Sequence, residues 1–175
     1  MLVECLESVR DSDHSQSSLA AGQGRGVAAG FWFNIGGQSS VTLNMNTDGT
    51  GTIIEGSPDI GGSRASMQMM AAEVLGIPLK NLKPIVADTD TLPYSATTGG
   101  SRTTFATGMA VIEAAEKVVS QVKERAASLW NVTAEQVDYF DGVATNAAGE
   151  ESMTLAEVCA AAEKTGGQIS GSANV

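Results

Sequence analysis

The sequence predicts an α+β fold in which strands, including a β-hairpin, are combined with helices, one of them long. Residues 40–46 alternate polar and apolar side chains and precede an Asp-Gly pair at 48–49, a pair typical of hairpin turns. Apolar side chains recur at helical spacing in residues 67–75. A second helical pattern, with a period near 3.6, extends from about 101 to 129 and predicts a helix of roughly 40 Å.

The first 35 residues predict a helix end, a connection and a strand. In residues 2–9 the leucines and valines fall on one helical face. Residues 11–24 are rich in Ser, Gly and Asp, which is typical of a connection. The apolar and aromatic run at 27–35 predicts a buried strand, which the glycine pair at 36–37 ends.

The central part predicts a strand, a helix and a second strand. Residues 50–55 return as the hairpin partner of 40–46. A Gly-rich loop then leads into the first helix, which Gly76 is placed to cap. Residues 83–87 predict a short strand, and 88–98 a polar loop. The expected buried face of the first helix comprises Met67, Met70, Ala71, Val74 and Leu75.

The long helix and the tail complete the prediction. Thr133 and Gln136 have capping-box spacing, and the Asp-Gly pair at 141–142 predicts a second hairpin. Residues 152–155 lead into a helix that ends near 164, and residues 168–175 are expected to be extended. The expected buried face of the long helix comprises Val111, Ala114 or Ala115, Val118, Val122, Ala126 and Leu129.

The order of these elements predicts the domain organisation. Residues 1–24 are assigned to a helix end and linker, and residues 25–175 to one domain. Within that domain we expect a main lobe over 25–130 and a smaller β/α unit over 131–175.

Charge and composition exclude several classes of protein. The net charge of −10 argues against nucleic-acid binding, because the phosphate backbone requires a basic surface. No apolar run approaches the roughly 18 residues of a membrane-spanning helix. The first residues include Glu4 and Glu7 and lack the basic start and apolar block of a signal peptide. We therefore expect a cytoplasmic protein.

Few side chains suit metal or nucleophilic chemistry. Cys5 and Cys159 form no CxxC pair, so they are expected to be reduced thiols that hold no iron–sulfur cluster. His14 is the only histidine, which excludes most zinc sites and Ser-His or Cys-His catalytic sets. Carboxylates of the long helix, such as Glu113 and Glu116, are expected to be solvated. We assign no catalytic residue and no metal ligand.

Two Gly-Ser-Arg loops, each directly before a helix, are the candidate binding features. Free backbone N–H groups and the helix dipole favour an anion at such a position, and hydroxyl and guanidinium donors strengthen it. A pair of these loops is suited to the two ends of a pyrophosphate-bearing cofactor. The simpler alternative is that both are helix caps. The candidate binding residues are Gly61, Gly62, Ser63, Arg64, Gly100, Ser101, Arg102, Thr103 and Thr104.

The order of motifs resembles the molybdenum-cofactor-binding region of the xanthine dehydrogenase/aldehyde oxidase family. The resemblance covers residues 24 to about 115. The segment Ile169-Ser170-Gly171-Ser172 resembles the end of the same region. The matching segments are Gly24-Arg25-Gly26-Val27-Ala28, the hairpin with Asp48-Gly49, Asp59-Ile60-Gly61, residues 71–78, Asp88-Thr89-Asp90, residues 100–104, and Gly108 with Ala110-Val111.

The resemblance implies a fold, a cofactor and partners. It implies two layers, with helices covering one face of a mixed sheet. It also implies contacts from both loops to molybdopterin, commonly the cytosine dinucleotide in bacteria, in an oxidoreductase that hydroxylates aldehydes, purines or other N-heterocycles. Electrons in this family leave through iron–sulfur and FAD subunits or domains, and the remaining molybdopterin-binding region would be a further partner.

Two departures from the family pattern bear on function. Many members have Gly-Gln-Gly in the first loop, where this chain has Gly61-Gly62-Ser63. The catalytic glutamate of the family has no counterpart before Val175. We therefore expect a fragment or split subunit that contacts the cofactor but is not active alone. The alternatives are a scaffold domain that has lost cofactor binding and an independent anion- or nucleotide-binding module.

Overall fold

The computed structural model describes residues 2–149 and 151–175 in two units, one ending at Trp32 and the other beginning at Phe33. The first unit contains α1 (Leu2–Asp11) and the short α2 (Asp13–Gln16). The helix predicted over residues 2–9 is confirmed, and no residue of it is buried. The unpredicted α2 begins where the Ser12 hydroxyl accepts a hydrogen bond from the Ser15 N–H, a typical N-cap.

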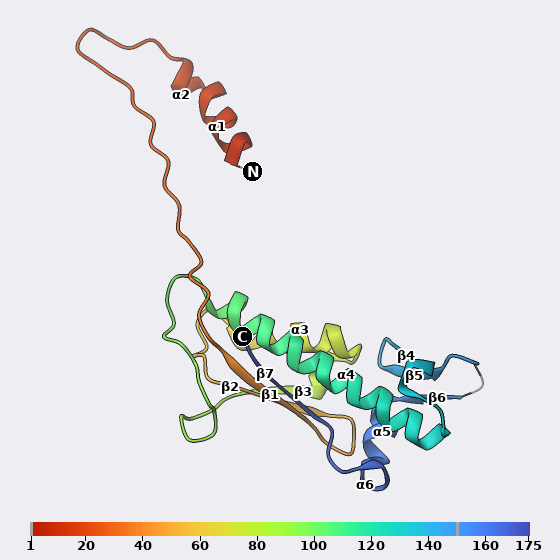
Figure 1. Ribbon diagram of the computed structural model, residues 1–175. Helices are drawn as coiled ribbons and strands as arrows, with labels where there is room; N and C mark the ends of the chain where they lie inside the picture. The colour runs from red at the N-terminus through yellow and green to blue at the C-terminus, as the bar shows by residue number, and fades with distance from the viewer. Residues whose placement is uncertain (1, 150) are drawn as a thin grey trace. The chain divides into compact units, whose positions relative to one another are not determined.

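The second unit is built on a four-stranded mixed sheet, with α3 (Ser63–Leu75) and α4 (Gly108–Trp130) along one face (Figure 1). The central hairpin strand pairs antiparallel with both of its neighbours, whereas the second hairpin strand pairs in parallel with the edge strand. The predicted α+β fold, a mixed sheet covered on one face by helices, is confirmed. The strands in spatial order are β3 (Leu82–Val86), β2 (Gly51–Glu55), β1 (Ser40–Met45) and β7 (Ser170–Asn174).

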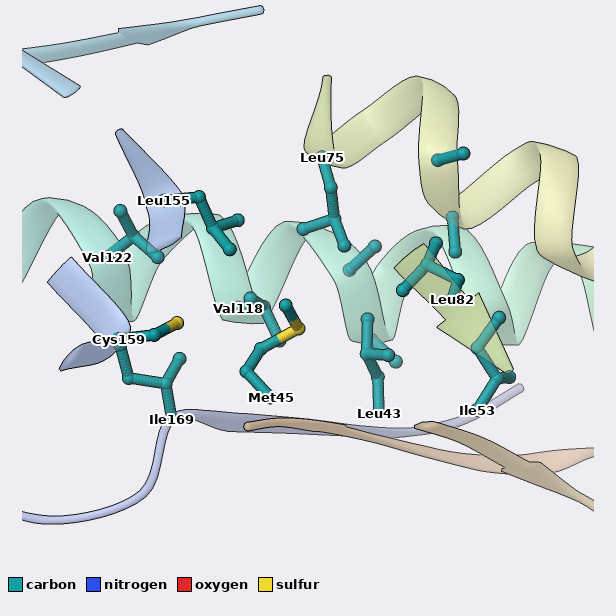
Figure 2. Close-up of a cluster of buried hydrophobic side chains, with 14 of the residues drawn as sticks. Leu43, Met45, Ile53, Leu75, Leu82, Val118, Val122, Leu155, Cys159 and Ile169 are labelled. Carbon is teal, nitrogen blue, oxygen red and sulfur yellow. The ribbon is translucent and has the colours of Figure 1, made fainter. Parts of the chain in front are cut away.

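The core lies between this sheet and the two helices (Figure 2). Alternate residues of β1, namely Val41, Leu43 and Met45, point toward the helices, as the period of two predicts. Each fully buried large aliphatic side chain contributes about 1.5–3 kcal/mol relative to exposure. The predicted buried face of α4 is confirmed except at Leu129, which is 38% exposed. The predicted face of α3 is buried at Met67, Ala71 and Leu75 and half-buried at Met70 and Val74.

A second, three-stranded antiparallel sheet follows α4. It comprises β4 (Val137–Phe140), β5 (Val143–Asn146) and β6 (Ser152–Thr154). The predicted hairpin and the capping box of residues 133–136 are both present. The helix predicted to end near 164 is split at Ala161 into α5 (Leu155–Ala160) and α6 (Ala162–Thr165), and a second capping box joins Thr154 and Glu157 at its start.

Residues 27–35 form no strand, so the buried strand predicted there is wrong. Val27 is 70% exposed and Phe31 is 89% exposed. At the end of this segment Gly36 and Gly37 have φ values of 63° and 96°, which turn the chain. The carbonyl groups of residues 36–38 all accept hydrogen bonds from the Arg102 side chain, and that of Gln38 also accepts the Ala96 N–H at 2.9 Å.

Candidate anion-binding site

The two Gly-Ser-Arg loops leave the same end of the four-stranded sheet. The first, residues 56–62, connects β2 to α3. The second, residues 99–102, follows β3 and enters a π-helix, η2 (Thr103–Thr107), which continues directly into α4. Because β2 and β3 are parallel, both loops lie beyond the carboxyl ends of these strands, where open α/β sheets usually bind ligands.

The first loop supplies its own anion at the start of α3. The Asp59 carboxylate accepts hydrogen bonds from the Arg64 N–H at 3.1 Å and from the Ser63 hydroxyl at 3.4 Å. The Arg64 guanidinium also forms an ion pair with it at 3.2 Å. The Arg64 N–H is the main cause that holds the pKa of Asp59 below its ordinary value. A ligand anion at residues 61–64 would therefore compete with this carboxylate.

The backbone of the second loop is held in a left-handed conformation. Gly100 has a φ of 57° and Ser101 a φ of 54°, which is uncommon for a residue with a side chain. Two hydrogen bonds connect the loop to residues 34–35. The Ile35 N–H donates to the Gly100 carbonyl at 3.2 Å, and the Asn34 amide donates to the Ser101 carbonyl at 3.2 Å. The Ser101 side chain is exposed.

Arg102 is buried beneath the second loop and does not project toward a ligand. It is 1% exposed, and no carboxylate of residues 2–149 or 151–175 forms an ion pair with it. It thus places beside the loop a buried positive charge that has no carboxylate partner among the described residues. Its guanidinium donates to the carbonyls of Gly36 (2.7 Å), Ala96 (3.0 Å), Gly37 (3.1 Å) and Gln38 (2.8 Å) and to the Ser39 hydroxyl (2.5 Å).

Neither a metal centre nor a membrane span is present in the described part of the chain. No group of three His, Cys, Asp or Glu side chains there is arranged to hold a metal ion. Within the same residues, no helix combines the length and the apolar character needed to cross a bilayer.

Comparison with known protein families decides what kind of domain this is. A family model described as a molybdopterin cofactor-binding domain matches residues 5–175, nearly the whole chain. The chain belongs to this molybdopterin cofactor-binding domain family. The resemblance found from the sequence motifs is confirmed.

Relatives and solved structures agree with this assignment. The chain is 33% identical to the aldehyde oxidoreductase molybdenum-binding subunit PaoC of Escherichia coli K12, over 94% of this chain and 23% of PaoC. A copper- and molybdenum-containing CO dehydrogenase superposes with a TM-score of 0.73 at 22% identity, covering 78% of this chain and 18% of that one. Quinoline 2-oxidoreductase of Pseudomonas putida 86 gives a TM-score of 0.66 at 23% identity, covering 78% and 19%. The chain thus spans about a quarter of the length of PaoC.

Of the two loops, the second could hold an anionic group without displacing a carboxylate of the chain. A helix leaves its first N–H groups without partners within the helix, and here a buried cation lies behind them. The Thr103 hydroxyl is buried and has no hydrogen-bond partner among the described residues, whereas Thr104 is exposed. π-Helical turns such as η2 are frequent at functional sites. At the first loop, Asp59 already occupies the corresponding position.

The sequence motifs did not indicate the polar residues that join the two loops inside the protein. The hydroxyls of Ser39 and Ser57 both contact the Thr107 hydroxyl, at 3.0 and 2.8 Å. The Glu55 carboxyl, 1% exposed, accepts the Ser57 N–H at 2.6 Å. The burial of Glu55 could have been predicted, because it follows the buried residues Gly51 and Ile53 at the two-residue spacing of β2.

Proposed function

We propose that this chain holds the pyrophosphate of a molybdopterin cofactor, as the cytosine dinucleotide, in a molybdenum hydroxylase of the xanthine dehydrogenase/aldehyde oxidase type. Membership of the molybdopterin-binding family and the similarity to PaoC support the cofactor class and the type of enzyme. The single observation that carries the role of the second loop is the buried Arg102 charge beneath an exposed helix start.

Each residue of the second loop has its own proposed role. The left-handed backbone at Gly100 and Ser101 presents the loop to the anion, and the exposed hydroxyls of Ser101 and Thr104 donate to phosphate oxygens. The buried Arg102 attracts the anion through its charge and holds the loop in place through its hydrogen bonds. Thr103 supplies a hydroxyl that has no hydrogen-bond partner among the described residues.

The first loop has a secondary role in this proposal. Gly61 and Gly62 take left-handed conformations, with open space where a Cβ would lie. Ser63 and Arg64 approach the cofactor once Arg64 exchanges the Asp59 carboxylate for a ligand anion, which its 46% exposed side chain permits.

The remaining parts of the enzyme are proposed to come from outside this chain. The rest of the molybdenum-binding subunit would supply the other half of the pocket and the catalytic glutamate. Iron–sulfur and FAD subunits or domains would accept the electrons, and the complex would be cytoplasmic. The chain's span of 23% of PaoC supports this division of roles.

The test separates the hydroxyl of Ser101 from the conformation of its backbone. Ser101→Gly removes the hydroxyl and relieves the left-handed strain, so the chain should fold at least as well as the native one. In the assembled molybdenum-binding subunit, Ser101→Gly combined with Thr104→Val should lower both the molybdenum content and the CMP released by acid hydrolysis. The control Ser120→Ala, which removes an exposed hydroxyl from α4, the helix that follows η2, should leave both unchanged.

Three outcomes distinguish the candidate functions. Full cofactor content in the double variant would exclude the second loop as the binding element. Normal assembly of the native subunit without molybdenum would favour the scaffold alternative, which the occupation of the α3 start by Asp59 supports. Binding of cytidine or adenine nucleotides by the chain alone, measured by calorimetry, would favour an independent nucleotide-binding module.

A further inference from the structure

A continuous path of buried polar groups connects the second loop to the strand that precedes the first loop. It starts at Arg102, whose guanidinium donates to the Ser39 hydroxyl at 2.5 Å. The Ser39 hydroxyl contacts that of Thr107 at 3.0 Å, and Thr107 contacts the Ser57 hydroxyl at 2.8 Å. Ser57 in turn donates its N–H to Glu55 at 2.6 Å. All five of these residues are at most 2% exposed.

The two ends of the path have fixed hydrogen-bond directions, and its two central hydrogen bonds can run either way. A guanidinium only donates, so Ser39 accepts from Arg102. In the contacts of Thr107 with Ser39 and with Ser57, either hydroxyl can be the donor. Burial raises the pKa of Glu55, and hydrogen bonds from the Ser57 N–H and the Ser57 hydroxyl oppose this rise. Thr107 is thus hydrogen-bonded to one buried hydroxyl on each side.

Thr107 is the residue at which three segments meet. It is the last residue of η2, whereas Ser39 directly precedes β1 and Ser57 lies in the first loop. Arg102 also holds the carbonyls of residues 36–38, so the same path extends to the segment beside the second loop. Loss of the Thr107 hydroxyl would leave both Ser39 and Ser57 without this partner in a buried environment, which strongly disfavours the arrangement.

We infer that Thr107 is a positioning residue whose hydroxyl couples the first loop to the second, so that the order of each depends on the other. The coupling itself belongs to the chain alone, and its use in cofactor retention rests on the function proposed above. The two loops would then bind the two parts of a cofactor as one pre-organised site, which lowers the ordering cost of binding.

Hydrogen exchange of the full chain without cofactor tests the coupling. Thr107→Val removes the hydroxyl with little change of shape, and Thr107→Ser retains it. In Thr107→Val, backbone amides of residues 57–64 and 99–104 should both exchange about tenfold faster, the ratio that corresponds to about 1.4 kcal/mol. Thr107→Ser should restore native exchange in both loops. Ser57→Ala, a change in the first loop alone, should also accelerate exchange at 99–104.

Two results of the exchange experiment would contradict the coupling. Native exchange at 99–104 in both Ser57→Ala and Thr107→Val would overturn the coupling. Equal acceleration throughout α4 would show loss of global stability instead, and would also overturn it; Ser120→Ala provides the matched control on that helix. In the assembled subunit, Thr107→Val should lower molybdenum content and Thr107→Ser should not. Coupled loops with unchanged cofactor content in both Thr107→Val and the Ser101 variant would overturn the proposed function but leave the coupling intact.

Discussion

A methyl group added at Gly171 would collide with the backbone carbonyl oxygen of Ala114, because β7 lies directly against α4 at this point. The strand cannot simply move away, since Gly171 is paired with Leu43 in the register of β1 and β7. The close approach of helix and strand therefore requires glycine here for reasons of space.

We expect Gly171→Ala to destabilise the domain by roughly 1–3 kcal/mol or more, the usual cost of overpacking a close contact. The obstacle is backbone, which has less freedom to yield than a side chain. Urea unfolding gives the free energy directly. Ser172→Ala, one residue further along at an exposed position, should change stability by less than about 0.5 kcal/mol. Similar values for the two variants would contradict the tight packing of β7 on α4.

Gly76 and Gly61 separate the cost of backbone conformation from the cost of crowding. Both are left-handed, with φ values of 59° and 64°. A Cβ at Gly76 would lie 2.5 Å from the Cα of Asp141, whereas Gly61 has open space. Gly61→Ala should cost roughly 1–2 kcal/mol for conformation alone. Gly76→Ala should cost roughly 1–3 kcal/mol more, measured by thermal or urea unfolding. Equal losses would show that the hairpin beside Gly76 yields freely.

The buried Glu55 carboxyl should make stability depend on pH in a defined direction. Burial raises the pKa of Glu55 above 4.5, and Asp59 adds to the rise, while hydrogen bonds from Ser57 and the Arg64 charge oppose it. The folded chain therefore keeps this proton to higher pH than the unfolded chain. Between 4.5 and the raised pKa, the free energy of unfolding contributed by Glu55 falls as pH increases, and it is largest below 4.5.

Glu55→Gln removes this titration and provides the measurement. The difference in unfolding free energy, variant minus native, should increase from pH 4.5 toward pH 8, because only the native chain loses stability from a buried charge. Urea titrations at several pH values give this difference. A constant difference across the range, or one that decreases, would contradict a raised pKa at this position.

The two cysteines should differ sharply in reactivity. Burial raises the pKa of the Cys159 thiol to about 11, so roughly one thiol in a thousand is ionised at pH 8. Cys159 is 1% exposed, whereas Cys5 is exposed. Iodoacetamide at pH 8 should therefore modify Cys5 in the native chain and both residues in urea, as read by mass spectrometry. Modification of Cys159 at the rate of Cys5 in the native chain would show that α5 opens readily.

The elements that could be predicted from sequence are those determined by local patterns. The buried face of α4 and the hairpin at residues 48–49 follow from side-chain spacing and turn chemistry within a few residues. The segment 27–35 could not be predicted, because its apolar character does not show whether a strand partner exists. The hydrogen bonds at its end come from residues far along the chain, such as the one from the Asn34 amide to the Ser101 carbonyl, 67 residues away.

At the candidate site, the residue types could be read from the sequence, whereas the directions of their side chains could not. The Gly-Ser-Arg motif indicated the second loop as a candidate anion-binding element. It could not show that the guanidinium of Arg102 turns inward to the carbonyls of residues 36–38. It likewise could not show that Asp59 lies at the start of α3, since that depends on how residues 60–62 turn. The hydroxyl path through Thr107 joins residues 50 and 68 positions apart in the chain.

Strand β1 receives its two neighbours at very different times during synthesis. Its hairpin partner β2 follows almost at once, but Ser40 and Asn174, which are joined by a hydrogen bond between β1 and β7, are 134 residues apart. At a synthesis rate of about 5–20 residues per second, one side of β1 remains an open edge for roughly 7–27 s. An open edge of this kind readily pairs with another chain. That side of β1 is therefore open to such pairing until β7 emerges.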